Sequence, residues 1–244
     1  MSNEYDKIEP DDRWVFDESV ADCFENMLQR SIPQYSVMRN SVVDLAYDII
    51  MGVPRKETFQ ILDVGCSDGL MIESLIAKFN EDNCNGYYYG VDISEPMLIK
   101  AKQRFYDNKC VTIGNCDLRK EFPTGYYDLI TSILTLQFIP IEYRQNIIQN
   151  IYNNLSSANG CFLMVEKVLG NTAKLDNLFV KNYYRQKELN GYSKHQIERK
   201  RLSLEGVLVP VTNSWNIELL KQAGFRQIDV FWRWMNFVGY IAIK

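Results

Sequence analysis

Three aspartates stand where apolar runs of this sequence end, and their positions favour ligand chemistry. Asp63 precedes the glycine-containing loop 65–69, Asp92 closes the next apolar run, and Asp117 follows the one after it. Parallel strands finish at a common rim, so we expect the three carboxylates to meet there. Carboxylates at such a rim accept hydrogen bonds from hydroxyl and amino groups, which indicates a site for a nucleoside-like ligand.

The loop after Asp63 reads Gly65-Cys66-Ser67-Asp68-Gly69. Its glycines let the backbone approach a ligand closely. Ser67 takes the middle position, no third glycine follows in register, and no Lys-Ser/Thr end is present. The loop is therefore neither a dinucleotide fingerprint nor a phosphate loop, and pyrophosphate binding is disfavoured. The carboxylate of Asp63 can face the ammonium of an amino acid, through water or backbone, rather than a phosphate. Its negative charge therefore favours an adenosyl ligand with an amino-acid group resembling methionine.

Each aspartate has an expected role and a plainer alternative. Asp92 is placed to accept both hydroxyls of a ribose, and Asp117 with Leu118 to accept from an adenine amino group while covering the base. A glycine-rich loop can be only a turn, however, and Asp92 before Ser94 can be part of a helix cap. Their joint occurrence at three successive strand ends favours the ligand site.

Strand-like runs alternate with helical patterns along the chain. This order predicts an α/β fold, a doubly wound, mostly parallel seven-stranded sheet of the class I methyltransferase type. A short link between the last two strands predicts a hairpin, which makes the final strand antiparallel. The expected strands are Phe59–Cys66, Tyr87–Ile93, Val111–Cys116, Tyr127–Leu136, Cys161–Val165, Gln227–Trp234 and Phe237–Ile243.

One domain is expected to span residues 1–244, because this length suits a single large α/β core. Two segments fall outside the alternating pattern: an N-terminal helical segment at 14–55 and a charged helical insertion at 175–207. Ligands of open α/β sheets bind beyond the carboxyl ends of the strands, so both segments are candidate lids.

The composition points away from several classes of protein. A net charge of −4 gives no general attraction to nucleic acid. His195 is the only histidine, and the six cysteines form no Cys-x-x-Cys pair, so no metal site is expected and the thiols are expected to be reduced and packed. The polar amino terminus lacks a signal-peptide pattern, and no apolar stretch reaches membrane-spanning length. We expect a cytoplasmic protein that acts on a small molecule without a membrane or direct nucleic-acid partner.

The chain closely resembles the carboxy-S-adenosylmethionine synthases, which make a cofactor for carboxymethylating a wobble uridine of bacterial transfer RNA. The likeness runs nearly end to end and includes stretches outside the generic methyltransferase fold. The matching stretches are Trp14-Val15-Phe16-Asp17-Glu18, Gln29 to Ser36, Gly65-Cys66-Ser67, Thr135-Leu136-Gln137-Phe138, Asn190-Gly191-Tyr192-Ser193 and Lys200-Arg201.

The resemblance implies a reaction and a set of site residues. The expected ligand is S-adenosylmethionine, or its carboxylated or demethylated form, and the expected donor is prephenate. The reaction creates a carboxylate beside the sulfonium, and a guanidinium can hold that carboxylate through two parallel hydrogen bonds. Arg201 would supply the guanidinium, from a neighbouring subunit if the protein is a homodimer. Without the resemblance, the charge-dense helix around Arg201 reads as a solvated face. The implied cofactor-binding residues are Tyr35, Gly65, Cys66, Ser67, Asp92, Ile93, Asp117, Leu118 and Arg201.

Ile133 departs from the family pattern. Alignment through Leu136-Gln137-Phe138 places Ile133 where the family usually has an asparagine that contacts the cofactor. Together with Tyr183, Tyr184 and Tyr192 of the insertion, this favours a second hypothesis, a methyltransferase that acts on a small acceptor. Methyl transfer needs positioning of the acceptor more than it needs catalytic groups. A third hypothesis is a non-catalytic adenosyl-binding protein, since no indispensable acid, base or nucleophile is visible.

Overall fold

The computed structural model describes residues 13–52, 58–81, 85–156 and 159–244. Its centre is a mixed sheet in the order β3-β2-β1-β4-β5-β8-β7, with the two-residue β6 paired to β5. The predicted class of fold is confirmed, because β1 to β5 run parallel and β8 runs antiparallel to both its neighbours. The strands are β1 Phe59–Val64, β2 Gly86–Asp92, β3 Val111–Asn115, β4 Leu129–Ile133, β5 Cys161–Leu169, β6 Val211–Thr212, β7 Gln227–Trp234 and β8 Phe237–Ile243.

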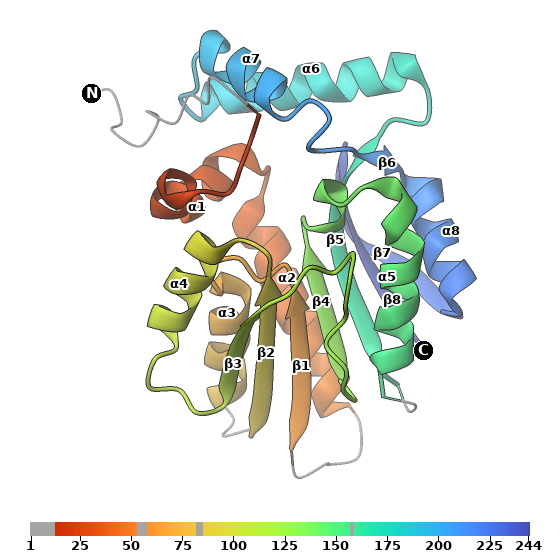
Figure 1. Cartoon of the computed structure of the whole chain (residues 1–244). Coiled ribbons are helices and arrows are strands. Elements are labelled where there is room, and N and C mark those ends of the chain that lie inside the picture. Colours follow the sequence, from red (N-terminus) through yellow and green to blue (C-terminus); the bar gives the residue numbers. More distant parts are fainter. Residues whose placement is uncertain (1–12, 53–57, 82–84, 157–158) are drawn as a thin grey trace.

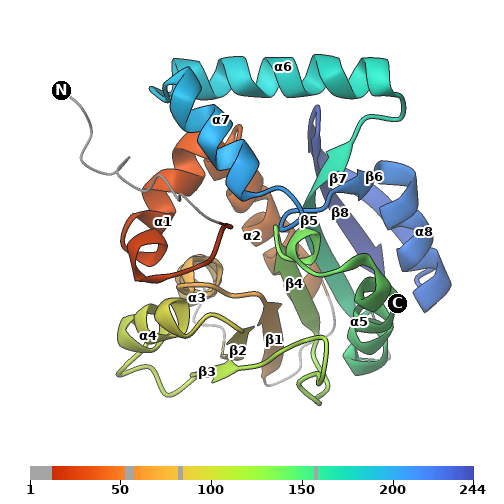
Figure 2. The ribbon, with the colours of Figure 1, turned by 45° about the horizontal axis from the view of Figure 1, so that its top comes forward.

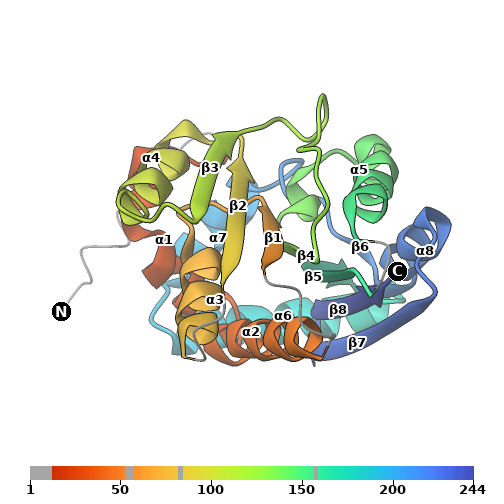
Figure 3. The same ribbon diagram turned by 90° about the horizontal axis from the view of Figure 1, so that it is seen from below.

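Helices cover both faces of the sheet (Figure 3). Residues of α2, α3 and α4 pack with Ile61 of β1 in one apolar cluster. Residues of α5 and α8 pack with Leu62 and Val64 in another, so successive side chains of β1 face opposite layers, as a pleated strand requires. The bounds are α2 Tyr35–Met51, α3 Leu70–Asn80, α4 Glu95–Arg104, α5 Ile141–Asn154 and α8 Asn213–Ala223.

Three further helices lie beyond the carboxyl ends of the parallel strands (Figures 1 and 2). They are α1 Glu18–Ser31, α6 Ala173–Leu189 and α7 Lys194–Ser203. The backbone N–H of Trp14 donates to Ser203 O at 2.9 Å, which joins the chain before α1 to the end of α7. The insertion 175–207 and the α1 part of segment 14–55 thus form helices over the rim, whereas α2 packs against a face of the sheet and residues 53–55 lie outside the described part. A lid function for either segment stays a prediction.

Local sequence fixes where the helices around the rim begin. Ser94 caps α4 by accepting from the Met97 N–H, and Pro96 sits in the first turn, where its missing N–H costs nothing. Asp17 caps α1 through the Val20 N–H, and Ser193 forms a capping box with Gln196 at the start of α7. The rim helices thus start at defined positions above the strands.

Two local expectations need correction. The fourth strand is shorter than predicted, because Leu134 adopts a left-handed φ of 59° that ends β4, and the short 3-10 helix η2 Leu136–Phe138 follows. Of the cysteines, Cys110 is exposed, so the prediction of packed thiols is wrong there; it lies on a turn before β3 rather than in an apolar run. The other free thiols of the described residues are buried, and Cys84 falls outside them. No helix among the described segments is long and apolar enough to span a bilayer.

Candidate functional site

A cavity of about 370 Å³ lies at the rim, between the strand ends and the helices above them. The loop after β1, the end of β2, the segment after β3 and the end of β4 form its floor. Residues from the chain before α1, from α1 and from α7 form its roof. Of the predicted residues, it is lined by Tyr35, Asp63, Gly65, Cys66, Ser67, Asp92, Ile93, Asp117, Leu118 and Ile133.

The carboxylate of Asp92 ties the β1 loop to β2. Its Oδ2 accepts from the backbone N–H of Ser67, and its Oδ1 from that of Ser94, both at 2.9 Å. The helix-cap alternative is thus partly realised, since Ser94 caps α4 while Asp92 holds the Ser94 backbone. The same carboxylate lines the cavity, so capping and ligand contact are compatible.

The β1 loop requires backbone angles that favour glycine. Gly65 has a φ of 76°, and its N–H donates to Val91 O at 2.8 Å. A Cβ on Gly65 would overlap the side chain of Thr135, which follows β4. Glycine is therefore needed here for both conformation and space.

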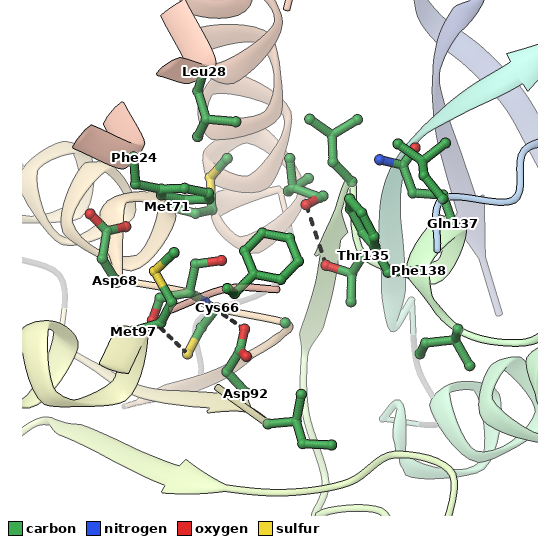
Figure 4. Close-up of a pocket in the computed structure, with 18 of the residues that line it drawn as sticks. Phe24, Leu28, Cys66, Asp68, Met71, Asp92, Met97, Thr135, Gln137 and Phe138 are labelled. Carbon is green, nitrogen blue, oxygen red and sulfur yellow. Dashed lines mark hydrogen bonds between the residues drawn. The ribbon is translucent and has the colours of Figure 1, made fainter. Parts of the chain in front are cut away.

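Negative charge gathers around Cys66 (Figure 4). Asp63 and Asp68 are buried and Asp92 is partly buried, and burial, then the charges of Asp63, Asp92 and Asp68, hold the pKa of the Cys66 thiol well above its usual value. Burial raises the pKa of Asp63 to about 7, although the Thr131 hydroxyl donates to its Oδ1 at 2.7 Å. Among the described residues, Asp68 has an ion pair, with Arg104, while Asp63 and Asp92 receive only hydroxyl or backbone donors. Such a floor suits a ligand that carries positive charge.

Asp117 is held by a neighbour that the sequence did not single out. Arg119 forms a bidentate pair with it, at 2.7 and 2.8 Å, and this pairing lowers the pKa of Asp117 well below its usual value. Arg119 also lines the cavity, beside Ile93 and the buried Leu118. The backbone N–H of Arg119 also donates to Asp117 Oδ1 at 3.1 Å, and Lys120 Nζ lies 3.4 Å from Oδ2, so donors of the chain already engage the roughly four lone-pair directions of this carboxylate.

The loop after β4 is fixed by a buried acid and a buried base. Glu166 on β5 accepts from the N–H groups of Leu136 and Gln137, at 2.9 and 2.8 Å, and burial raises its pKa to about 8. Arg144 on α5 donates to Ile139 O at 2.8 Å and to Val209 O at 2.7 Å. Both were missed from the sequence, where an acid inside the apolar run of β5 was the available signal.

Arg201 does not line the cavity of its own chain. Its guanidinium lies 2.7 Å from Glu198 of the same helix, and its side chain is 42% exposed. From α7 it is Lys200 that lines the cavity, with Nζ 4.6 Å from the centroid of the Trp14 ring. The structure therefore does not bring Arg201 together with the other predicted site residues.

The cavity contains no arrangement typical of metal catalysis. Within the described segments, no group of three or more His, Cys, Asp or Glu side chains is placed to hold a metal ion. The available chemistry is binding by carboxylates, backbone amides and aromatic rings, together with electrostatic stabilisation.

Known structures show the same fold at low sequence identity. The CurJ carbon methyltransferase matches 93% of this chain and 61% of its own, with 13% identity and a TM-score of 0.66. Human N-acetylserotonin methyltransferase, solved in complex with SAM, matches 93% of this chain and 56% of its own, with 18% identity and a TM-score of 0.59. Residues 62–162 match the model of a methyltransferase domain. Fold and cavity together define a domain of the class I methyltransferase type.

Closer relatives specify the family. The carboxy-S-adenosyl-L-methionine synthase of Methylococcus capsulatus is 37% identical over 96% of this chain and 94% of its own length. That of Nautilia profundicola is 36% identical over 95% of both chains, and that of Helicobacter pylori 34% over 95% of both. The chain belongs to the carboxy-S-adenosyl-L-methionine synthase family.

Replacing Gly65 by alanine tests the geometry of the β1 loop. We expect Gly65→Ala to lower the free energy of unfolding by about 1–3 kcal/mol, because alanine resists the left-handed backbone and overlaps Thr135. Gly114→Ala is the control, since its Cβ would meet nothing within 4 Å, and we expect a change within about 0.5 kcal/mol. Urea denaturation measures both, and equal stabilities would contradict this account of the loop.

Proposed function

We propose that the protein binds S-adenosylmethionine in this cavity and converts it, with prephenate, to carboxy-S-adenosylmethionine and phenylpyruvate. The observation that carries the proposal is the set of three carboxylates around Cys66, supported by relatives of almost equal length that are named for this product. S-adenosylmethionine carries a sulfonium and an ammonium, and a floor of three carboxylates, of which only Asp68 has an ion pair among the described residues, favours both charges.

The predicted site residues divide along the length of such a ligand. Asp92 accepts from the ribose hydroxyls, while Ile93, Asp117 and Leu118 form the adenine end. The loop of Gly65, Cys66 and Ser67 lies under the sulfur, Asp63 supplies negative charge beneath the amino-acid end, and Tyr35 and Ile133 complete that end. Their common position at the cavity supports this division.

The reaction balances without an external oxidant or base. Prephenate gives phenylpyruvate by losing carbon dioxide and hydroxide, the hydroxide takes a proton from the sulfonium methyl to form water, and the resulting ylide attacks the carbon dioxide. The protein contributes positioning, exclusion of water and a cation for the new carboxylate. The apolar roof, which includes the buried Trp14 and Phe24 and the partly buried Phe138, supports the exclusion of water.

Arg201 is proposed to act across a homodimer. It is exposed, pairs with Glu198 and does not line the cavity of its own chain, which supports its presentation to the new carboxylate by a second copy. The family resemblance supports a role in transfer RNA modification in the cytoplasm, and the net charge of −4 supports action on the small molecule alone, with a separate enzyme using the product on the nucleic acid.

A direct assay tests the activity. The protein is incubated with S-adenosylmethionine and prephenate, and mass spectrometry is expected to show a sulfonium heavier by one carboxyl group, together with phenylpyruvate. Failure to form it by a folded protein that binds S-adenosylmethionine would overturn the proposed reaction.

The second candidate function is methyl transfer to a small acceptor. It is favoured by Ile133, which lines the cavity at the end of β4 with a side chain that neither donates nor accepts a hydrogen bond. Labelled methyl appearing in a metabolite-extract acceptor, with no carboxylated sulfonium formed from prephenate, would support this function instead.

The role of Arg201 is tested by comparing the affinities for the carboxylated and the uncarboxylated ligand. We expect Arg201→Leu to weaken binding of carboxy-S-adenosylmethionine by roughly tenfold or more, the value of a bidentate charged bond, and to leave S-adenosylmethionine binding nearly unchanged. Arg185→Leu on the neighbouring α6 is the matched control. Titration calorimetry measures both ligands, and equal loss for the two would contradict the role.

Mixed dimers then show which subunit supplies Arg201. A dimer of one Arg201→Leu chain and one Asp92→Ala chain contains one complete site only if the arginine acts across the interface. We expect coexpression of the two inactive variants to restore activity. No restoration, despite isolation of the mixed dimer, would show that the arginine serves its own chain.

Protons should accompany ligand binding. The pKa of Asp63 is about 7 in the free protein, and a ligand cation favours its charged form, so binding near pH 6.5 is expected to release protons and to tighten from about pH 6 to about pH 8. Calorimetry in buffers of different ionisation enthalpy counts these protons. Asp63→Asn should reduce the count, and an unchanged count would assign the protons elsewhere.

A further inference from the structure

Asp68 is a buried carboxylate with an unused oxygen in the cavity wall. It lies between the β1 loop and α3, is 5% exposed, and lines the cavity. Arg104 donates to its Oδ2 at 3.3 Å and to its backbone oxygen at 3.0 Å. Its Oδ1 is buried and has no hydrogen-bond partner. A buried oxygen without a donor is costly, so this atom fits a ligand donor.

The surroundings of Asp68 raise its pKa overall, with burial as the largest cause. Burial raises its pKa, while Arg104 and the backbone amides at the start of α3 lower it. A carboxylate before the first turn of a helix also meets the positive end of the helix dipole. Because Arg104 already occupies the other oxygen, the free Oδ1 remains for a second cationic donor.

Arg39 and Asp68 both act on Tyr35. Arg39 follows Tyr35 by four residues on α2, so both side chains lie on one helix face. The Arg39 Cζ is 5.5 Å from the centroid of the Tyr35 ring, and its buried Nε has no hydrogen-bond partner. Burial raises the pKa of Tyr35 to about 12, Arg39 lowers it, and Asp68 raises it, so the Tyr35 hydroxyl lies within the fields of both charges.

We propose that Asp68 and Tyr35 bind the α-amino-acid end of the adenosyl ligand and that Arg39, which does not line the cavity, acts through Tyr35. Asp68 Oδ1 accepts from the ammonium, and the α-carboxylate accepts from the Tyr35 hydroxyl, to which Arg39 adds positive charge. An acid with one oxygen free of donors and a phenol beside a guanidinium match the zwitterion of an amino acid. Asp63 lies deeper, with one oxygen taken by Thr131, and acts as a fixed charge beneath.

The inference rests on the proposed function only in the identity of the ligand, so its test uses binding without turnover. Three ligands are titrated calorimetrically: S-adenosylhomocysteine, its decarboxylated amine, and 5′-methylthioadenosine, which lacks both charged groups. Wild-type protein is compared with Asp68→Asn and Arg39→Met. Asp44→Asn on the same α2 and Arg226→Met on the turn before β7 are exposed controls, and thermal melts verify folding.

Each variant should lose affinity only for ligands that carry its group. Arg39→Met is expected to weaken S-adenosylhomocysteine by roughly tenfold or more and to spare both other ligands. Asp68→Asn should weaken S-adenosylhomocysteine and the amine by a similar factor and spare methylthioadenosine. The controls should bind all three ligands as the wild type does.

The outcomes separate this inference from the function it rests on. An equal loss of affinity for all three ligands, or no loss for any, would overturn the inference. Asp68 would then serve only to hold Arg104, and Arg39 only to pack against Tyr35. If the wild type binds none of the three ligands, the proposed cofactor is wrong and the inference falls with it. Failure of carboxyl transfer alone leaves these binding differences intact.

Discussion

The cavity depends on one carboxylate that holds two backbone segments together. Asp92 accepts from Ser67 after β1 and from Ser94 before α4, so the positions of the loop and the helix are set by a single side chain at the end of β2. These bonds also position the two other acids, because Asp63 precedes the same loop and Asp68 lies within it. The position of the site therefore follows from strand pairing. Its negative charge remains because the chain places few positive side chains beside these acids.

The burial of acids without full compensation distinguishes this rim from a simple turn. A turn of glycines needs no charge, whereas the floor around Cys66 keeps three carboxylates near one another despite the cost of desolvation. Proteins retain such arrangements where a ligand supplies the missing charge. By contrast, Asp117 has its compensating charge within the chain, from Arg119, which suits contact with a neutral base.

Sequence patterns predicted most of the sheet and the aspartates at its rim, because buried parallel strands give long apolar runs and their ends are marked by polar residues. Ten of the predicted site residues do line one cavity. The patterns did not predict the left-handed Leu134, or the bonds of Glu166 to residues about thirty positions earlier, because both depend on contacts between β4 and β5 that form only in the folded chain. They also gave no orientation for Arg201, since a charged helix presents several faces.

The hydrogen bond from Trp14 to Ser203 joins parts of the chain almost two hundred residues apart, at the roof of the cavity. Lys200 stacks on the same tryptophan, so the segment before α1 and the end of α7 cover the cavity as one unit. Movement of either segment away from the cavity would break the bond between Trp14 and Ser203 and the contact with Lys200. Opening of this side is thereby linked to the attachment of the residues that precede α1.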